Sequence, residues 1–158
     1  MLFQKLRSVI DPLLSDEQRG FRSSRSCQTA LALFTQDVLN GIDKRNGSVW
    51  VVFIDFRKAF NSVDTWFLLE KLKSKFGFYE NLTKLLNNYL SNRFFQIKYC
   101  NAKSEGFLEA NSVRQGSSLE PLLFSAFIND IAEVITVPFK LYADDLATYF
   151  HSTDKEII

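Results

Sequence analysis

The 158-residue sequence has one histidine, two cysteines, three prolines and six glycines. A lone histidine, His151, leaves little material for a histidine-based catalytic triad or a multi-histidine metal site. Cys27 and Cys100 lie far apart, with no Cys-x-x-Cys pair, so they predict neither a zinc site nor a disulfide framework. We expect two buried thiols in a reducing, intracellular compartment.

The sequence also lacks a basic excess and a long apolar run. Nineteen Lys and Arg nearly cancel eighteen Asp and Glu, so any role on nucleic acid must rest on local patches. The longest apolar run, at 49–54, is far too short to span a membrane, and the first residues lack a secretory signal. We therefore expect no membrane partner. Sixteen phenylalanines indicate an aromatic-rich core.

Periodicity predicts an α+β fold, a small antiparallel sheet covered by helices. Residues 48–56 are apolar with almost no alternation, which indicates a strand buried on both faces. Loops and helices are expected elsewhere, with Asp64 capping one helix and Gly77 ending it. The other expected elements are a loop at 12–25, helices at 27–44, around 82–90 and from about 121, paired strands at 94–99 and 104–109, and a hairpin of strands at 139–142 and 146–150.

Two acidic positions stand out at the ends of apolar strands. Asp55 follows six consecutive apolar residues, where a carboxylate is costly to bury unless it is paired or bound to a cation. Asp144 and Asp145 are adjacent at the tip of the last hairpin. Taken singly, the first could merely cap a turn and the second could be an ordinary polar turn.

Taken together, these acids favour a metal site. Strand ends of one small sheet can converge, and adjacent like charges repel unless a cation neutralises them. Oxygen ligands without nearby histidine or cysteine select Mg²⁺ or Mn²⁺. Two such ions held by carboxylates serve in-line phosphoryl transfer, in which a 3′-hydroxyl attacks and pyrophosphate leaves.

Two further segments could contact nucleic acid. Gln115 and Gly116 precede the predicted helix at 121, and the glycine allows close backbone approach to a nucleotide, although an ordinary turn is the alternative. Arg19, Arg22 and Arg25 fall within seven residues without an acid among them. They form either a phosphate-contacting arm or a solvated loop.

Several blocks, in order, resemble those of reverse transcriptases. They are LSDEQRGFRSSRS (14–26), FIDFRKAFNSVD (53–64), YLSNRFFQ (89–96), VRQGSSLEPLLF (113–124) with FINDI (127–131), and LYADDLA (141–147). The phrase PLLFSAFINDI and the tetrapeptide YADD resemble the enzymes of non-LTR (LINE, jockey-like) retrotransposons. The resemblance covers about residues 12–150.

The resemblance implies roles for individual residues. Asp55, Asp144 and Asp145 match the three palm carboxylates, with Asp55 and Asp144 the principal metal ligands and Phe56 offering a backbone carbonyl. The substrate-facing positions are Phe60 as a steric gate against a ribose 2′-hydroxyl, Gln115 and Gly116 beside the nucleotide and template, Tyr142 under the primer terminus, and Arg22 and Arg25 in contact with nucleic acid or triphosphate.

The resemblance also implies an activity and partners. The activity is RNA-directed DNA polymerisation with two Mg²⁺ ions, for which Mn²⁺ can substitute, and the partners are an RNA template, a DNA primer and dNTPs. Residues 1–158 would form one partial domain, with a fingers-side segment at about 12–47, the palm at about 48–150 and no thumb. Remaining fingers and thumb segments, and an endonuclease domain of a parent polyprotein, are further expected partners, and the nucleus is the expected location.

Two positions depart from the family pattern. Asn61 replaces an aspartate, and Glu120 replaces a glycine before Pro121. These changes and the missing thumb leave two alternatives to an active polymerase: an inactive remnant, and an RNA-directed RNA polymerase palm. The bulk of Phe60 disfavours the latter, because a ribonucleotide polymerase must admit the 2′-hydroxyl. We expect the isolated chain to polymerise poorly, because it lacks elements that hold template and primer in register.

Overall fold

The structure is a computed structural model that describes residues 2–44, 47–91, 93–109 and 116–152. The chain divides into two compact units, each assembled from segments distant in sequence. The first unit comprises residues 1–10 and 58–127, and the second comprises residues 11–57 and 128–158. This division differs from the predicted one near residue 47, because the first long strand and the segment before it share a unit.

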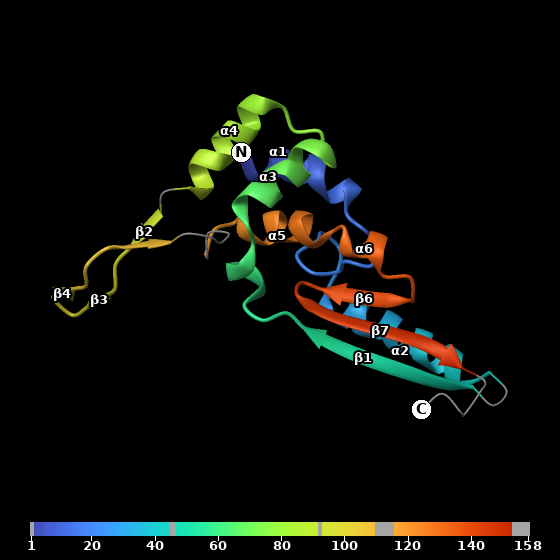
Figure 1. Cartoon of the computed structure of the whole chain (residues 1–158). Helices are drawn as coiled ribbons and strands as arrows, with labels where there is room; N and C mark the ends of the chain where they lie inside the picture. The colour runs from blue at the N-terminus through green and yellow to red at the C-terminus, as the bar shows by residue number, and fades with distance from the viewer. Residues whose placement is uncertain (1, 45–46, 92, 110–115, 153–158) are drawn as a thin grey trace. The chain divides into compact units, whose positions relative to one another are not determined.

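A three-stranded antiparallel sheet forms the centre of the second unit (Figure 1). Its strands are β1 (Ser48–Asp55), β6 (Phe139–Tyr142) and β7 (Asp145–Ser152), in the order β1-β7-β6. The prediction that β1 is buried on both faces is wrong. It is an edge strand, and Val52 and Phe53, which point to opposite faces, are 51% and 74% exposed. The predicted α+β class is confirmed.

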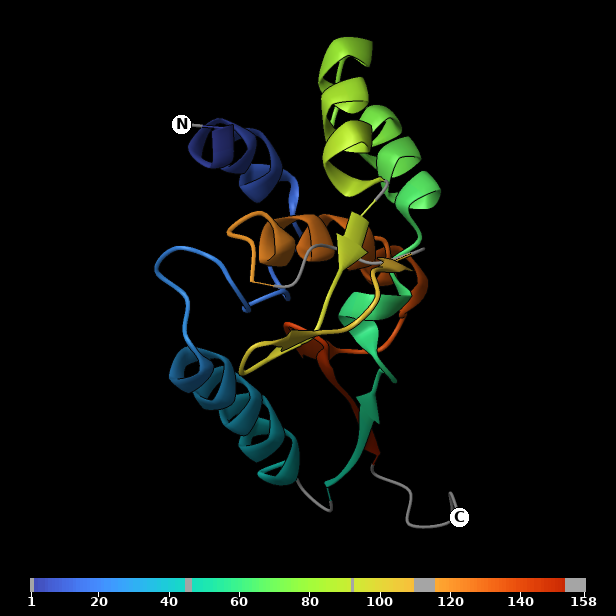
Figure 2. The ribbon, with the colours of Figure 1, turned by 90° about the vertical axis from the view of Figure 1, so that its left-hand side faces the viewer.

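Helix α2 (Cys27–Ile42) packs on one face of this sheet (Figure 2). A capping box begins it, because Ser26 and Thr29 each accept a hydrogen bond from the other's backbone N–H. The ring of Phe34 contacts the rings of Phe53 and Tyr149, with centroids 6.0 and 5.6 Å apart. Of these three rings only that of Tyr149 is buried, whereas Phe53 is 74% exposed, so this contact adds little to the aromatic-rich core expected from composition.

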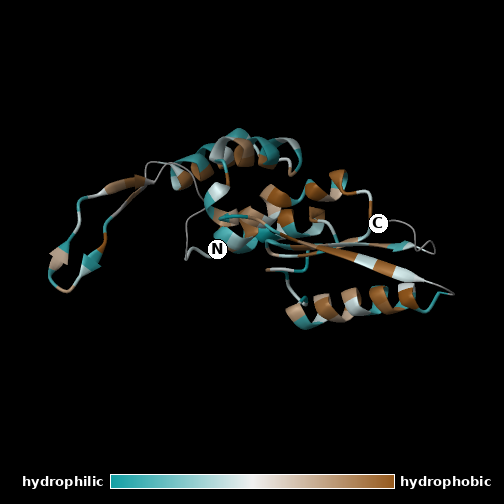
Figure 3. Ribbon diagram, turned by 60° about the horizontal axis from the view of Figure 1, so that its bottom comes forward, coloured by the Kyte–Doolittle hydropathy of each residue, from teal (hydrophilic) through white to brown (hydrophobic). Residues whose placement is uncertain are grey.

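The other face of the sheet carries the buried cluster of Phe139, Leu141 and Leu146. Phe56 and residues from the short helix α6 (Ile131–Val134) pack against this cluster. Apolar residues, brown in Figure 3, recur along the helices and long strands. The two faces therefore bury different side chains of β6 and β7, as strand alternation requires.

Lys140 and Asp37 form a polar network between α2 and the sheet. The Lys140 ammonium donates to Glu17 at 2.7 Å and lies 3.2 Å from a carboxylate oxygen of Asp37. The Tyr149 hydroxyl donates to the same Asp37 oxygen at 2.5 Å. This hydrogen bond, together with Lys140, lowers the pKa of Asp37, whereas burial raises the pKa of Tyr149 to about 12.

The first unit is mainly helical. Asp64 accepts hydrogen bonds from the N–H groups of Trp66 and Phe67, which confirms the predicted cap. The Lys71 ammonium donates to the carbonyl of Phe127 at 2.5 Å and so satisfies a last-turn carbonyl of α5. The helices are α1 (Leu2–Ile10), the 3₁₀ turn Ala59–Ser62, α3 (Thr65–Ser74), α4 (Glu80–Leu90) and α5 (Glu120–Ile128), whose last residue enters the second unit.

Two short strand pairs follow α4. Strand β2 (Arg93–Phe95) pairs with β5 (Phe107–Glu109), and β3 (Lys98–Tyr99) pairs with β4 (Ala102–Lys103). The predicted pairing around Asn101 is therefore confirmed.

Three other observations correct or extend the sequence analysis. Cys27 and Cys100 are exposed, so the expectation of buried thiols is wrong. Cys27 is the first residue of α2, and Cys100 lies in the turn between β3 and β4. Helix α1 was not predicted. Among the described residues, no helix is both long and apolar enough to cross a membrane.

We predict that the Asp37 network stabilises the fold most above the ordinary carboxyl pKa. A lowered native pKa contributes stability that is present above the ordinary aspartate pKa of 3.8 and is lost as pH falls through the native pKa. The free energies of unfolding of the wild type and Asp37→Asn, measured with urea, should therefore differ most at pH 7. This difference should shrink towards pH 3. Asp43→Asn, at an exposed acid just after α2, is the control. A difference for Asp37→Asn that is constant with pH would contradict the prediction.

Candidate catalytic carboxylate site

The register of β1 and β7 places two of the predicted carboxylates side by side. Asp55 is the direct antiparallel partner of Asp145, which in turn pairs with Tyr142 of β6. Direct partners share a face of the sheet, with Cβ atoms about 4.5–5.5 Å apart. Asp144 is the second residue of the two-residue turn between β6 and β7, and Asp145 is the first residue of β7. The convergence of Asp55 on this hairpin is the arrangement that the sequence analysis expected.

A cavity of about 360 Å³ lies between α2 and this end of the sheet. Asp55, Tyr142 and Asp145 line it, together with apolar side chains that include Ala30 and Phe34 of α2. Asp55 and Asp145 are themselves exposed, and Asp144 is half-buried. The two carboxylates therefore open to solvent beside an apolar wall.

The donor set at this position suits a divalent cation. Directly opposed like charges destabilise a strand pair, and a cation between them removes that repulsion. All the donors are carboxylate oxygens, which Mg²⁺ and Mn²⁺ prefer. The side chains are not arranged as a finished site, because the described residues contain no group of three acidic, histidine or cysteine side chains placed to hold an ion. The residues therefore fit a divalent cation in their backbone positions and in the chemistry of their donor atoms.

The turn that carries Asp144 has an unusual backbone. Ala143 has a φ of 58°, in the left-handed region that favours glycine. Such a conformation costs a non-glycine residue about 1–3 kcal/mol and persists only where its surroundings hold it. The turn therefore needs support from outside the hairpin.

Gln18 supplies that support and was missed by sequence reasoning. Gln18 is only 1% exposed. Its side-chain amide donates a hydrogen bond to the carbonyl of Ala143 and accepts one from the N–H of Ala143, each at 3.1 Å. The same amide oxygen accepts from the N–H of Gly20 at 2.8 Å. A polar residue in a polar loop carries no local signal of burial, and only its membership of the block at 14–26 pointed to this segment.

The backbone around Gln18 pairs with β6 through an isolated parallel bridge. The N–H of Arg19 donates to the carbonyl of Leu141 at 2.8 Å, and the N–H of Leu141 donates to the carbonyl of Glu17 at 3.1 Å. Gln18 and Leu141 form a parallel bridge. Gly20 then passes so close to the turn that a Cβ there would lie 2.3 Å from the nitrogen of Ala143.

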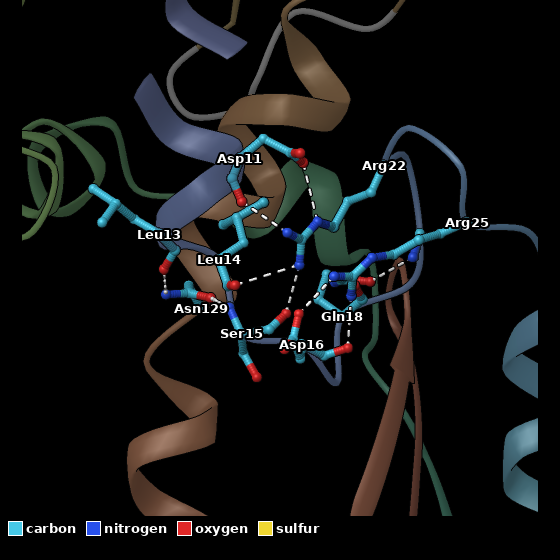
Figure 4. Close-up of polar contacts among 10 residues, drawn as sticks. Asp11, Leu13, Leu14, Ser15, Asp16, Gln18, Arg22, Arg25 and Asn129 are labelled. Atoms are coloured by element: carbon cyan, nitrogen blue, oxygen red, sulfur yellow. Dashed lines mark hydrogen bonds and ion pairs between the residues drawn. The ribbon is translucent and has the colours of Figure 1, made fainter. Parts of the chain in front are cut away.

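Arg22 and Arg25 hold this loop from within (Figure 4). The Arg22 guanidinium donates to the Asp11 carboxylate at 3.0 Å and to the backbone carbonyls of Asp11, Leu14 and Ser15, and its side chain is 7% exposed. Arg25 donates to the Asp16 carboxylate at 2.6 Å and to the carbonyls of Asp16 and Gln18. Both arginines, which were predicted to contact phosphate, thus stabilise the loop through hydrogen bonds within the chain.

Asn129 joins the same loop to the chain just after α5 (Figure 4). Its side-chain oxygen accepts from the N–H of Ser15 at 2.7 Å, and its amide nitrogen donates to the carbonyl of Leu13 at 3.3 Å. The FINDI block therefore has a structural function that its sequence did not reveal.

The remaining predicted site residues belong to the first unit or fall outside the described ranges. Phe60, in the first unit, stacks on Phe124 with ring centroids 4.2 Å apart. Gln115 lies outside the described residues. Gly116 is exposed with a φ of 78°, and its N–H donates to the Glu120 carboxylate at 2.8 Å. Glu120, the departure from the family's glycine, thus has a local hydrogen-bonding role.

The chain is similar in sequence to several known proteins. The family model described as reverse transcriptase (RNA-dependent DNA polymerase) matches residues 1–158. Two Drosophila melanogaster proteins are similar: the probable RNA-directed DNA polymerase from transposon BS, 31% identical over 89% of this chain, and that from transposon X-element, 30% identical over 75%. A putative COX1/OXI3 intron 1 protein of Saccharomyces cerevisiae is 25% identical over 96% of the chain.

The chain belongs to the reverse transcriptase (RNA-dependent DNA polymerase) family. The transposon relatives support the predicted resemblance to the enzymes of non-LTR retrotransposons. The matches cover 16%, 13% and 17% of the lengths of these three relatives. Members of the family generally use divalent metal ions, which agrees with the oxygen donors at Asp55 and Asp145.

We predict that Gly20→Ala destabilises the chain, because the new methyl group collides with backbone atoms of Ala143. Overpacking of this kind typically costs about 1–3 kcal/mol, measurable as a lower urea midpoint. Gly106→Ala is the matched control, since a Cβ there meets nothing closer than 3.8 Å. Equal midpoints for the two variants would show that the loop can move away from the hairpin at no cost.

Proposed function

We propose that this chain supplies the catalytic carboxylates of an RNA-directed DNA polymerase, which joins a dNTP to a primer 3′-hydroxyl and releases pyrophosphate. The observation that carries the proposal is the register of β1 and β7, which sets Asp55 beside Asp145 at the hairpin that bears Asp144. The family match makes this chemistry the natural use of the three acids. It also favours a DNA polymerase over an RNA-directed RNA polymerase.

In this proposal, Asp55 and Asp144 are the principal ligands of two Mg²⁺ ions, with Asp145 and the backbone carbonyl of Phe56 as supporting donors. Bound Mg²⁺ would lower the barrier to phosphoryl transfer by stabilising charge on the attacking and leaving oxygens. The protein's own contribution is to hold the carboxylates at adjoining strand ends. The repulsion between Asp55 and Asp145 favours cation uptake.

The substrate-facing roles rest on the family resemblance. Tyr142 lines the cavity beside Asp55 and Asp145, which supports a place under the primer terminus. Gln115 and Gly116 would face the nucleotide and the RNA template. For Arg22 and Arg25 we favour loop bracing over direct contact with phosphate, because their guanidinium groups already have partners within the chain.

A Mn²⁺ titration of the 158-residue chain, followed by electron paramagnetic resonance, tests the metal site directly. We expect Mn²⁺ to bind, Mg²⁺ to displace it, and Asp55→Asn and Asp144→Asn each to weaken binding by about tenfold or more, because each removes a ligand charge. Asp43→Asn is the matched control, since Asp43 is an exposed acid of the same unit just after α2.

This titration does not require polymerase activity. It can therefore detect an intact metal site even if the chain cannot hold template and primer. Equal binding by the wild type and both site variants would refute the assignment. An inactive remnant with a decayed site would give that same result.

Phe60 could act as the steric gate against ribose or could serve only in packing. Comparing a Phe60 variant with a variant of its stacking partner, Phe124, separates the two roles. We expect Phe60→Leu to raise the incorporation of UTP relative to dTTP, because the shorter side chain leaves room for a 2′-hydroxyl. The measurement is primer extension on poly(rA)/oligo(dT) with Mn²⁺, in a longer active protein that contains this chain. Phe124→Leu disturbs the same ring pair and should leave the ratio unchanged. Similar ratios for both variants would assign Phe60 to packing alone.

A further inference from the structure

We propose that Gln18 is a positioning residue for the catalytic hairpin: its side-chain amide holds Ala143 at both its N–H and its carbonyl and thereby sets the backbone position of Asp144. The inference rests on the function proposed above for Asp144. Gln18 itself touches neither substrate nor metal in this role.

The two hydrogen bonds act on both peptide planes that flank Ala143. The Ala143 N–H lies in the plane shared with Tyr142, and the Ala143 carbonyl lies in the plane shared with the nitrogen and Cα of Asp144. Since each peptide unit is planar, one amide that fixes both groups restrains the rotation that would swing Asp144 away. It also holds Ala143 in its left-handed conformation, with a φ of 58°.

The chemistry of the contact requires a carboxamide. Ala143 presents a donor and an acceptor to the same side chain, and a carboxamide combines both functions, whereas an ionised carboxylate only accepts. Gln18 is 1% exposed, and burying its amide would be costly without partners. A side chain that only filled space would be served equally well by an apolar residue of similar length.

Gln18 is itself held in place by its surroundings. Its amide oxygen also accepts from the N–H of Gly20, its backbone carbonyl accepts from Arg25 at 3.2 Å, and its neighbours pair with Leu141 of β6. The loop can therefore transmit a fixed position to the hairpin. This gives the arginine-braced loop a purpose that does not require contact with nucleic acid.

Gln18→Met tests the proposal, because methionine keeps the length and loses both hydrogen-bonding functions. By amide hydrogen exchange, we expect the Ala143 N–H to exchange at least about tenfold faster in the folded variant. The N–H of Tyr149, bonded to Pro138 in the same sheet, should keep its protection. The Mn²⁺ dissociation constant should rise by about tenfold, as is typical when a partner that orients a ligand is lost.

Thr83→Val is the matched control, since it removes the hydrogen bond of another buried residue, from Thr83 to the carbonyl of Tyr79, in the other unit. It should change neither Ala143 exchange nor Mn²⁺ binding. Unchanged Ala143 exchange or an unchanged Mn²⁺ dissociation constant in folded Gln18→Met would overturn the proposal. Failure of the wild type to bind Mn²⁺ would instead reject the proposed function, while the exchange measurement would still test the hydrogen bonds.

If Gln18→Met does not fold, the wild type provides the test. The side-chain NH₂ protons of Gln18 should exchange at least about tenfold more slowly than those of Gln28, an exposed glutamine of α2. Equal rates would show that the Gln18 amide is not engaged, and would overturn the proposal.

Discussion

The antiparallel register between β1 and β7 is the constraint on which the site depends. Side chains alternate between the two faces of a strand, so a slip of one residue would carry Asp55 to the face opposite Asp145. The packing of Phe34 against Phe53 disfavours such a slip of β1, because it would carry the Phe53 ring to the face opposite Phe34. The hydrogen bond from Tyr149 to Asp37 adds a polar restraint to the same face. These contacts between α2 and the sheet therefore stabilise the fold and also favour the register that aligns the carboxylates.

The second constraint is the dependence of the hairpin that carries Asp144 on a loop far away in sequence. Gln18 and Ala143 are 125 residues apart, and the hairpin's left-handed turn is held by that contact. The loop in turn depends on Arg22, Arg25 and Asn129 for its shape. The site therefore depends on contacts between the two chain segments of the second unit, and the loop connects the fold's stability to the position of Asp144.

The features predicted correctly from sequence are those with local causes. Asp64 caps its helix through neighbouring N–H groups, and the hairpin with Asp144 at its tip follows from apolar strands around a polar turn. The position of β1 at the sheet edge could not be predicted, because strand order depends on long-range pairing that an apolar run does not specify. The buried roles of Gln18 and Arg22 were missed for the same reason, since their composition is that of a solvated loop. The family resemblance located the acids, and the structure showed what holds them.

The most direct test of the account is to locate bound Mn²⁺ by the paramagnetic broadening of assigned backbone amide signals in the 158-residue chain. Broadening falls steeply with distance, so the account predicts that at low Mn²⁺ it is strongest at residues 55–56 and 142–145 and is lost in Asp144→Asn. Broadening centred instead on Glu17 and Asp37, the acids that surround Lys140, would contradict the assignment of Asp55 and Asp144 as metal ligands.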